Sequence, residues 1–130
     1  SFDGEHVHLA ESWAWPKPVQ QVRGRPGVPV LVGGAPGPIL FEHIAEFADG
    51  WIPIGGAGVA AAMADLRAAA ERAERDPDEL TVIPFGTLPD QGKLDHYASL
   101  GIRETVLRLP SAGRDEVLAT LDAYAPFVAG

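Results

Sequence analysis

Cysteine is absent from the sequence, and its absence removes several kinds of chemistry at once. Without a thiol there is no disulfide framework, no Cys-ligated zinc or iron–sulfur cluster, and no thiol nucleophile. Long apolar runs are also missing, because no segment approaches the roughly 20 consecutive apolar residues that span a bilayer. The first residues, SFDGEHVHL, carry neither the basic stretch nor the apolar stretch of a secretory signal. We therefore expect a cytoplasmic protein without a membrane partner.

Positive charge is scarce. Ten Lys and Arg residues stand against 18 Asp and Glu residues, which gives a formal net charge of −8. A protein that binds nucleic acid needs clustered basic side chains, and here the basic residues are scattered, so we expect no nucleic-acid partner. What remains is ordinary: 46% hydrophobic and 22% charged residues over 130 positions are typical of one globular domain.

The hydrophobic pattern divides the chain at residue 27. Residues 1–27 contain three prolines and two tryptophans with little periodicity, which predicts an irregular loop region with a short strand near 7–9. Residues 28–130 alternate short apolar runs with helical patterns, which predicts four strand–helix units in a single domain. We expect strands at 28–32, where the continuous apolar run suits burial on both faces, and at 51–54, 80–85 and 105–109. We expect helices at 38–48, 58–75, 92–100 and 112–125.

Capping residues refine the helix boundaries. Gly50 is a candidate stop for the first helix, and Ser111 is a candidate N-cap for the last one. In the last helix an apolar stripe at helical spacing predicts side chains that point inward, and it consists of Val117, Leu118, Leu121 and Tyr124.

Four successive βα units indicate an α/β fold with a parallel sheet and right-handed crossovers. Two architectures fit this pattern: a doubly wound open sheet, and a segment of a (β/α)8 barrel. A complete barrel needs about 250 residues, so four units amount to half of one.

Paired glycines follow two consecutive predicted strands. Gly33-Gly34 ends the first strand and Gly55-Gly56 follows the second, and each pair precedes a helix. Ligands bind at the carboxyl ends of strands in such folds, and glycine allows backbone N–H groups to approach an anion at a helix N-terminus. The pattern therefore predicts a phosphate cradle. The alternative is that the glycines only make tight turns, since the spacing matches neither G-x-G-x-x-G nor a Walker A loop.

Few other residues suggest chemistry. His6 and His8 have same-face spacing on a strand, but no third ligand has suitable spacing, so we expect no metal site. The G-x-S-x-G motif is absent, and nothing identifies a catalytic acid, base or nucleophile. Trp51 opens a buried strand and is expected in the core. Trp13 and Trp15 lie in a polar loop, where they could line an apolar pocket or a subunit contact.

The strings FDGEHVHL, WAWPKPVQ, GVPVLVGG and FADGWIPIGG, in this order and spacing, resemble the luciferase-like monooxygenase family. They are most similar to its deazaflavin-dependent (coenzyme factor 420) branch. The resemblance implies a (β/α)8 barrel oxidoreductase that uses reduced deazaflavin, in preference to FMN, at the C-terminal mouth of the barrel. It implies that Gly33 and Gly34 form one cofactor phosphate loop, that Ile54, Gly55 and Gly56 form a second, that Trp15 lies beside the substrate, and that Asp49-Gly50 is a structural turn.

The resemblance also implies a missing half. Members of the family carry a comparable stretch before the point where this sequence begins, and that stretch supplies the first barrel strands and the side chains that activate a small organic substrate. We therefore expect the C-terminal half of a barrel, catalytically incomplete by itself, whose open strand edges favour a homodimer. The alternative is a non-enzymatic, stand-alone binding or assembly module with a flavodoxin-like sheet.

Overall fold

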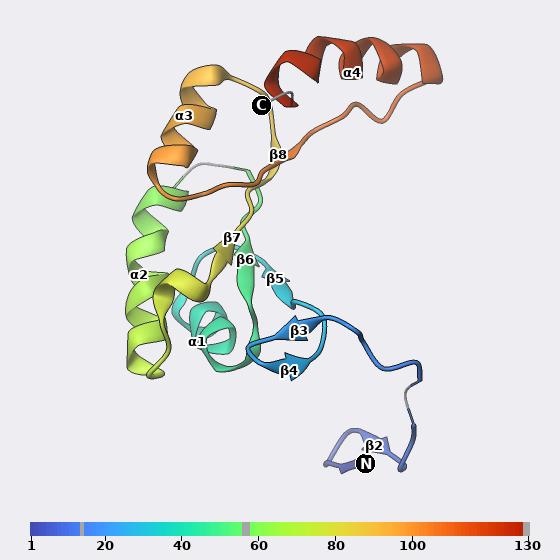
Figure 1. Ribbon diagram of the computed structural model, residues 1–130, viewed down its shortest axis with the longest axis vertical. Coiled ribbons are helices and arrows are strands. Elements are labelled where there is room, and N and C mark those ends of the chain that lie inside the picture. Colours follow the sequence, from blue (N-terminus) through green and yellow to red (C-terminus); the bar gives the residue numbers. More distant parts are fainter. Residues whose placement is uncertain (14, 56–57, 129–130) are drawn as a thin grey trace.

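The computed structural model describes residues 1–13, 15–55 and 58–128 (Figure 1). Over these residues the protein is mixed α/β, with four α-helices and parallel strands. The helices are α1 (Pro38–Phe47), α2 (Val59–Arg72), α3 (Gln91–Ser99) and α4 (Arg114–Val128), with the 3-10 turn η1 at Pro77–Glu79. The strands are β1 (Phe2–Asp3), β2 (His8–Leu9), β3 (Gln21–Val22), β4 (Arg25–Pro26), β5 (Leu31–Gly33), β6 (Gly50–Ile52), β7 (Thr81–Val82), β8 (Phe85–Thr87) and β9 (Val106–Leu107).

The parallel strands lie side by side in the order of the sequence. β5, β6 and β7 form one parallel sheet, and β8 pairs in parallel with β9. The two sheets are continuous, because the Phe85 amide donates to the Pro53 carbonyl at 2.8 Å and Ile54 bridges Phe85 in parallel. Residues 81–87 therefore act as one strand between β6 and β9.

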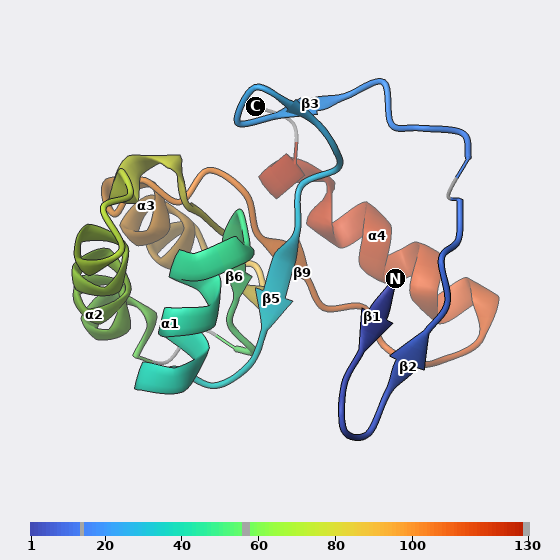
Figure 2. The same ribbon diagram turned by 90° about the horizontal axis from the view of Figure 1, so that it is seen from below.

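Helices cover one face of these strands. Val32, Trp51 and Val82 pair in register and share that face, so their side chains point toward α1 and α2. Trp51 is fully buried and meets the Phe41 ring edge-on, with 5.2 Å between ring centroids. Full burial of a large apolar side chain of this kind stabilises the folded state by about 1.5–3 kcal/mol. Figure 2 shows α1, α2 and α3 together on one side of β5 and β6.

The opposite face of the strands is apolar and uncovered by the described part of the chain. Strand alternation and the observed register place on it six apolar side chains, which we call the open face: Leu31, Ile52, Ile54, Ile83, Phe85 and Val106. None of the six is buried, and Ile54, Phe85 and Val106 are 81%, 50% and 41% exposed.

Several predicted boundaries and caps are wrong. The first strand begins only at Leu31, and Val28 and Val30 are exposed because they precede an edge strand. Gly50 does not stop α1 but lies buried inside β6, where an added Cβ would collide with the Thr81 carbonyl. Ser111 is not an N-cap, because α4 begins at Arg114.

Residues 1–27 and α4 pack less closely against the parallel strands and helices α1 to α3 than the sequence predicted. The predicted loop region, residues 1–27, contains two hairpins of two-residue strands, β1–β2 and β3–β4, with His8–Leu9 inside the strand predicted near 7–9. α4 extends away from the strands in Figure 1. None of its described residues is buried, and the stripe predicted to point inward is only partly covered, because Val117 and Tyr124 are half-buried while Leu118 and Leu121 are exposed.

Candidate functional site

The two glycine loops predicted to form a phosphate cradle lie next to each other at the carboxyl ends of β5 and β6. Gly33 pairs with Ile52 in register, and the Gly34 amide donates to the Ile52 carbonyl at 3.4 Å. Ile54 and Gly55 follow directly on β6. The structure therefore brings these predicted residues together, while Gly56 lies outside the described residues.

Trp51 fixes the first loop to the sheet. Its indole Nε1 donates to the Gly34 carbonyl at 3.0 Å while its ring is packed against Phe41. The sequence indicated a core residue here, and the burial confirms this. The pattern gave no sign of the loop contact, since hydropathy does not report where an indole N–H points.

The glycine amides themselves are already occupied. The Gly34 amide donates to Ile52, and the Gly55 amide donates to the Phe85 carbonyl at 2.8 Å. Gly55 has a φ of 73°, in the left-handed region that favours glycine, so its residue type is required by the turn. These glycines shape the loops, and any anion would have to be held by amides further along each loop.

Such amides are available where α1 and α2 begin. The first amides of a helix have no partner within it, which leaves Ile39 and Leu40 in α1 and Ala60 and Ala61 in α2. Neither helix has a side-chain cap or an acidic residue in its first turn. Both starts therefore present uncompensated partial positive charge, which suits an anion.

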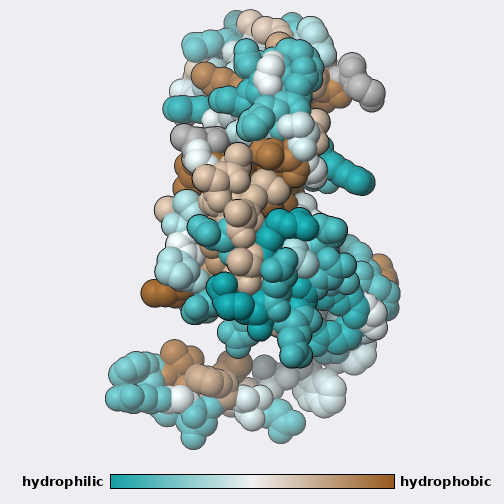
Figure 3. Space-filling model, turned by 90° about the vertical axis from the view of Figure 1, so that its left-hand side faces the viewer, coloured by the Kyte–Doolittle hydropathy of each residue, from teal (hydrophilic) through white to brown (hydrophobic). Residues whose placement is uncertain are grey.

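A groove of about 460 Å³ runs between the two helix starts and along α2. Figure 3, which views the α2 side, shows apolar side chains gathered over the middle of the molecule. The groove is lined by Pro36, Gly37, Pro38, Phe41, Gly58, Ala61, Ala62, Asp65, Ala68 and Arg72. Arg72 is in the last turn of α2, about 18 Å along the helix from Ala60. Backbone amides, rather than a cationic side chain, are thus the donors available at the helix starts.

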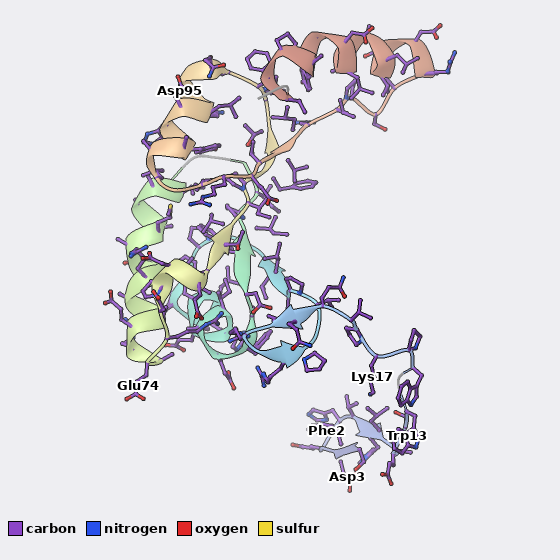
Figure 4. All side chains as sticks on the ribbon, in the orientation of Figure 1. Phe2, Asp3, Trp13, Lys17, Glu74 and Asp95 are labelled. Carbon is purple, nitrogen blue, oxygen red and sulfur yellow. The ribbon has the colours of Figure 1, made fainter. Side chains whose placement is uncertain are left out.

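The structure does not bring Trp15 to the glycine loops. Trp15 is 70% exposed in the segment between β2 and β3, where the Lys17 Nζ lies 5.5 Å from its ring centroid. Figure 4 shows the neighbouring Trp13 and Lys17 on this segment, away from the strands of the body. The role of Trp15 beside a substrate stays a prediction.

The histidines also lie apart from the loops. His8 contacts the Asp3 carboxylate across the β1–β2 hairpin, and His43 and His96 are exposed on helices. Within residues 1–13, 15–55 and 58–128, no group of three or more His, Cys, Asp or Glu side chains is arranged to hold a metal. Nor does that part of the chain contain a helix long and apolar enough to cross a membrane.

Asp49 lies at the opposite, amino-terminal end of β6 and has a structural environment. Its carboxylate accepts a hydrogen bond from the Val30 amide at 2.7 Å and forms an ion pair with Arg23 at 3.0 Å. The buried Arg75 guanidinium lies 3.9 Å away and donates to the Ile44 carbonyl at 2.9 Å. Burial, and then Arg23, lower the pKa of Arg75, and Asp49 and Glu79 partly oppose this. Sequence reasoning named the Asp49-Gly50 turn but missed both arginines, which are distant in sequence.

Known proteins resemble most of this chain. The sequence model of the family described as luciferase-like monooxygenase matches residues 1–88. An uncharacterized protein of Mycobacterium bovis and one from each of two strains of Mycobacterium tuberculosis are 35% identical to it over 135 residues. Each alignment covers 95% of this chain and 42% of the relative, so the chain spans about two-fifths of the length of the curated relatives it matches.

Proposed function

The chain belongs to the luciferase-like monooxygenase family, and on this premise we propose that it is the part of a flavin-type oxidoreductase that holds the cofactor phosphate. The observation that carries the proposal is the meeting of two uncapped helix starts, α1 and α2, beside adjacent glycine loops. A phosphate is the anion that such backbone donors recognise best.

The strand order supports a half-barrel. β5, β6, β7–β8 and β9 are parallel and neighbour one another in chain order, with α1, α2 and α3 on one side, as in a (β/α)8 barrel. A flavodoxin-like sheet would instead place its third strand beside its first. We therefore propose that these residues are the C-terminal half of a barrel, and the alternative of a stand-alone flavodoxin-like module is less well supported.

The chain's own residues would bind and orient the cofactor. In this proposal the amides at Ile39, Leu40, Ala60 and Ala61 hold its phosphate, and Gly33, Gly34 and Gly55 shape the loops that aim those amides. Ile54, exposed at the rim of the open face, offers apolar contact to the ring system. When bound, a deazaflavin, which the resemblance favours over FMN, supplies hydride chemistry through its ring.

Catalysis by this chain alone is not part of the proposal. No side chain among the described residues at the two loops is placed as a general acid, a general base or a nucleophile. In this proposal the side chains that bind and activate the small organic substrate lie on other strands of a longer protein. The chain covers 42% of the length of each relative, which leaves room for such strands.

Fluorescence titration with the oxidised deazaflavin coenzyme, and separately with FMN, tests the proposal. Gly55→Val should weaken binding at least about tenfold, because valine cannot adopt the left-handed turn that aims the loop. Gly101→Val is the matched control: Gly101 also has a positive φ, 81°, with open space around an added Cβ, but it caps α3. We expect it to leave the affinity within about twofold, since it strains only a helix cap.

Two results would contradict the proposal. One is the same loss of affinity in both variants, because the effect would then be one of folding. The other is a folded chain that binds neither cofactor, which would favour the assembly module.

A further inference from the structure

The chain exposes more surface than a self-contained protein of its mass. Its solvent-accessible surface is 9277 Å² for 13.7 kDa. A folded monomer of that mass exposes about 6,600 Å², so the excess is about 2,700 Å². If each of two copies buried this excess, the interface would total about 5,400 Å², near the upper end of obligate dimers, which bury about 2,000–5,000 Å² or more.

Part of this excess is the open face. Its side chains are large and apolar, and three of them are adjacent across neighbouring strands: Ile54 bridges Phe85, and Phe85 pairs with Val106. The opposite face of the same strands, under α1 and α2, is buried to 0% at Trp51 and 8% at Val82. Further large apolar side chains are exposed on α4 and on residues 1–19.

Two strand edges are also open within the described residues. β5 has a partner only on the side of β6, and β9 has one only on the side of β8. An unpaired edge exposes backbone donors and acceptors that favour another strand. The two edges belong to parallel strands at opposite ends of the strand order, so each can serve as the missing neighbour of the other.

We propose that a second copy of this chain covers the open face. A two-fold axis parallel to the strands places β5 of each copy beside β9 of the other, which satisfies all the edges with two symmetry-related strand pairings. Eight parallel strands then enclose a layer of side chains that includes Phe85 and Val106 from each copy, with Ile54 at its rim. Eight is the strand number at which a barrel interior is just filled by side chains. The association needs no cofactor, so it is independent of the proposed function.

Light scattering on the cofactor-free 130-residue chain tests the association. We expect twice the 13.7 kDa of one chain. Phe85→Lys should shift the mass to that of one chain, because it puts a charge into the enclosed layer. Phe47→Lys is the matched control: Phe47 is 51% exposed, against 50% for Phe85, but lies on α1, and this variant should remain a dimer. Circular dichroism on each variant reports whether it is folded.

Cross-linking tests the arrangement without disturbing the open face. The chain has no cysteine, so two can be introduced without background, both at the amino-terminal ends of the edge strands, which adjoin in a parallel pair: Val30→Cys before β5 and Glu104→Cys before β9. With a short bismaleimide, the double variant should give a covalent dimer and each single variant should not. A folded wild-type monomer would overturn the proposal and assign the open face to other strands of a longer protein. Equal loss of the dimer in both lysine variants, or cross-linking of either single variant, would overturn it as well.

Discussion

At the scale of single residues, Asp49 joins segments that are far apart in the sequence. Its carboxylate accepts a hydrogen bond from the Val30 amide and forms an ion pair with the Arg23 guanidinium. It also lies near Arg75, whose guanidinium donates a hydrogen bond to the Ile44 carbonyl of α1. Because burial already disfavours the charged form of Arg75, the carboxylate offsets a cost that the fold would otherwise bear in full.

Asp49→Ala should lower the free energy of unfolding by about 3 kcal/mol, because it leaves the buried Arg75 without its carboxylate. Urea unfolding at a fixed protein concentration measures this. Asp78→Ala is the matched control, since Asp78 forms a 2.8 Å ion pair with Arg67 on the surface, and exposed pairs contribute less than about 1 kcal/mol. Equal losses in the two variants would show that Asp49 has no special structural role.

The structural role of a single residue can be predicted when neighbouring residues in the sequence determine it, and not when a distant segment does. The turn at Gly55 and the burial of Trp51 follow from local pattern, and the structure agrees with both. The need for glycine at position 50 does not, because it arises from the close passage of β7, about 30 residues away in sequence. The occupied amides of Gly34 and Gly55 are another case, since their acceptors lie on neighbouring strands.

At the scale of elements, α4 and α2 form a natural comparison. They have 15 and 14 residues, but α2 buries five side chains, whereas α4 buries none among its described residues. α4 is tied to β9 by the Tyr124 hydroxyl, which donates to the Arg108 carbonyl at 3.0 Å. A helix of this length without packing is only marginally stable in water.

We predict that amides of α4 exchange with deuterium at least about 100-fold faster than those of α2, because only α2 depends on opening of the core. Hydrogen exchange read by mass spectrometry compares the two helices within one sample. Similar protection of both would mean that α4 packs on a surface not seen here.

Periodicity located all four helices and the parallel strands of residues 28–130, because each has an apolar face or run of its own. It failed where an element's surroundings decide the outcome. The stripe of α4 has the right spacing, but Leu118 and Leu121 are 43% and 45% exposed, and Leu121 lines an open hollow with Leu107 of β9 instead of packing in a core. The first strand was predicted too long for a related reason. Its pairing with β6 begins only at Leu31, so Val28 and Val30 have no neighbouring strand residue in the ladder.

At the scale of the whole molecule, the unfilled surfaces share one explanation. The open face and the two strand edges are the surfaces that the proposed second copy of this chain would cover. Strands β5 to β9 are parallel and lie side by side in chain order, and the chain covers 42% of the length of each relative. Sequence pattern predicted the α/β class and the family, but the strand order could be read only from the pairing.

The central claim is that the starts of α1 and α2 hold a cofactor phosphate, and amide NMR shifts test it most directly. The isotope-labelled chain would be titrated with the deazaflavin coenzyme and with FMN, and then with the phosphate-free ring compound of each. We predict that the phosphorylated ligands shift the amides of Ile39, Leu40, Ala60 and Ala61, and that the phosphate-free compounds leave them in place, because these amides face only the anion. Equal shifts with and without the phosphate, or shifts confined to residues 1–27, would contradict the claim.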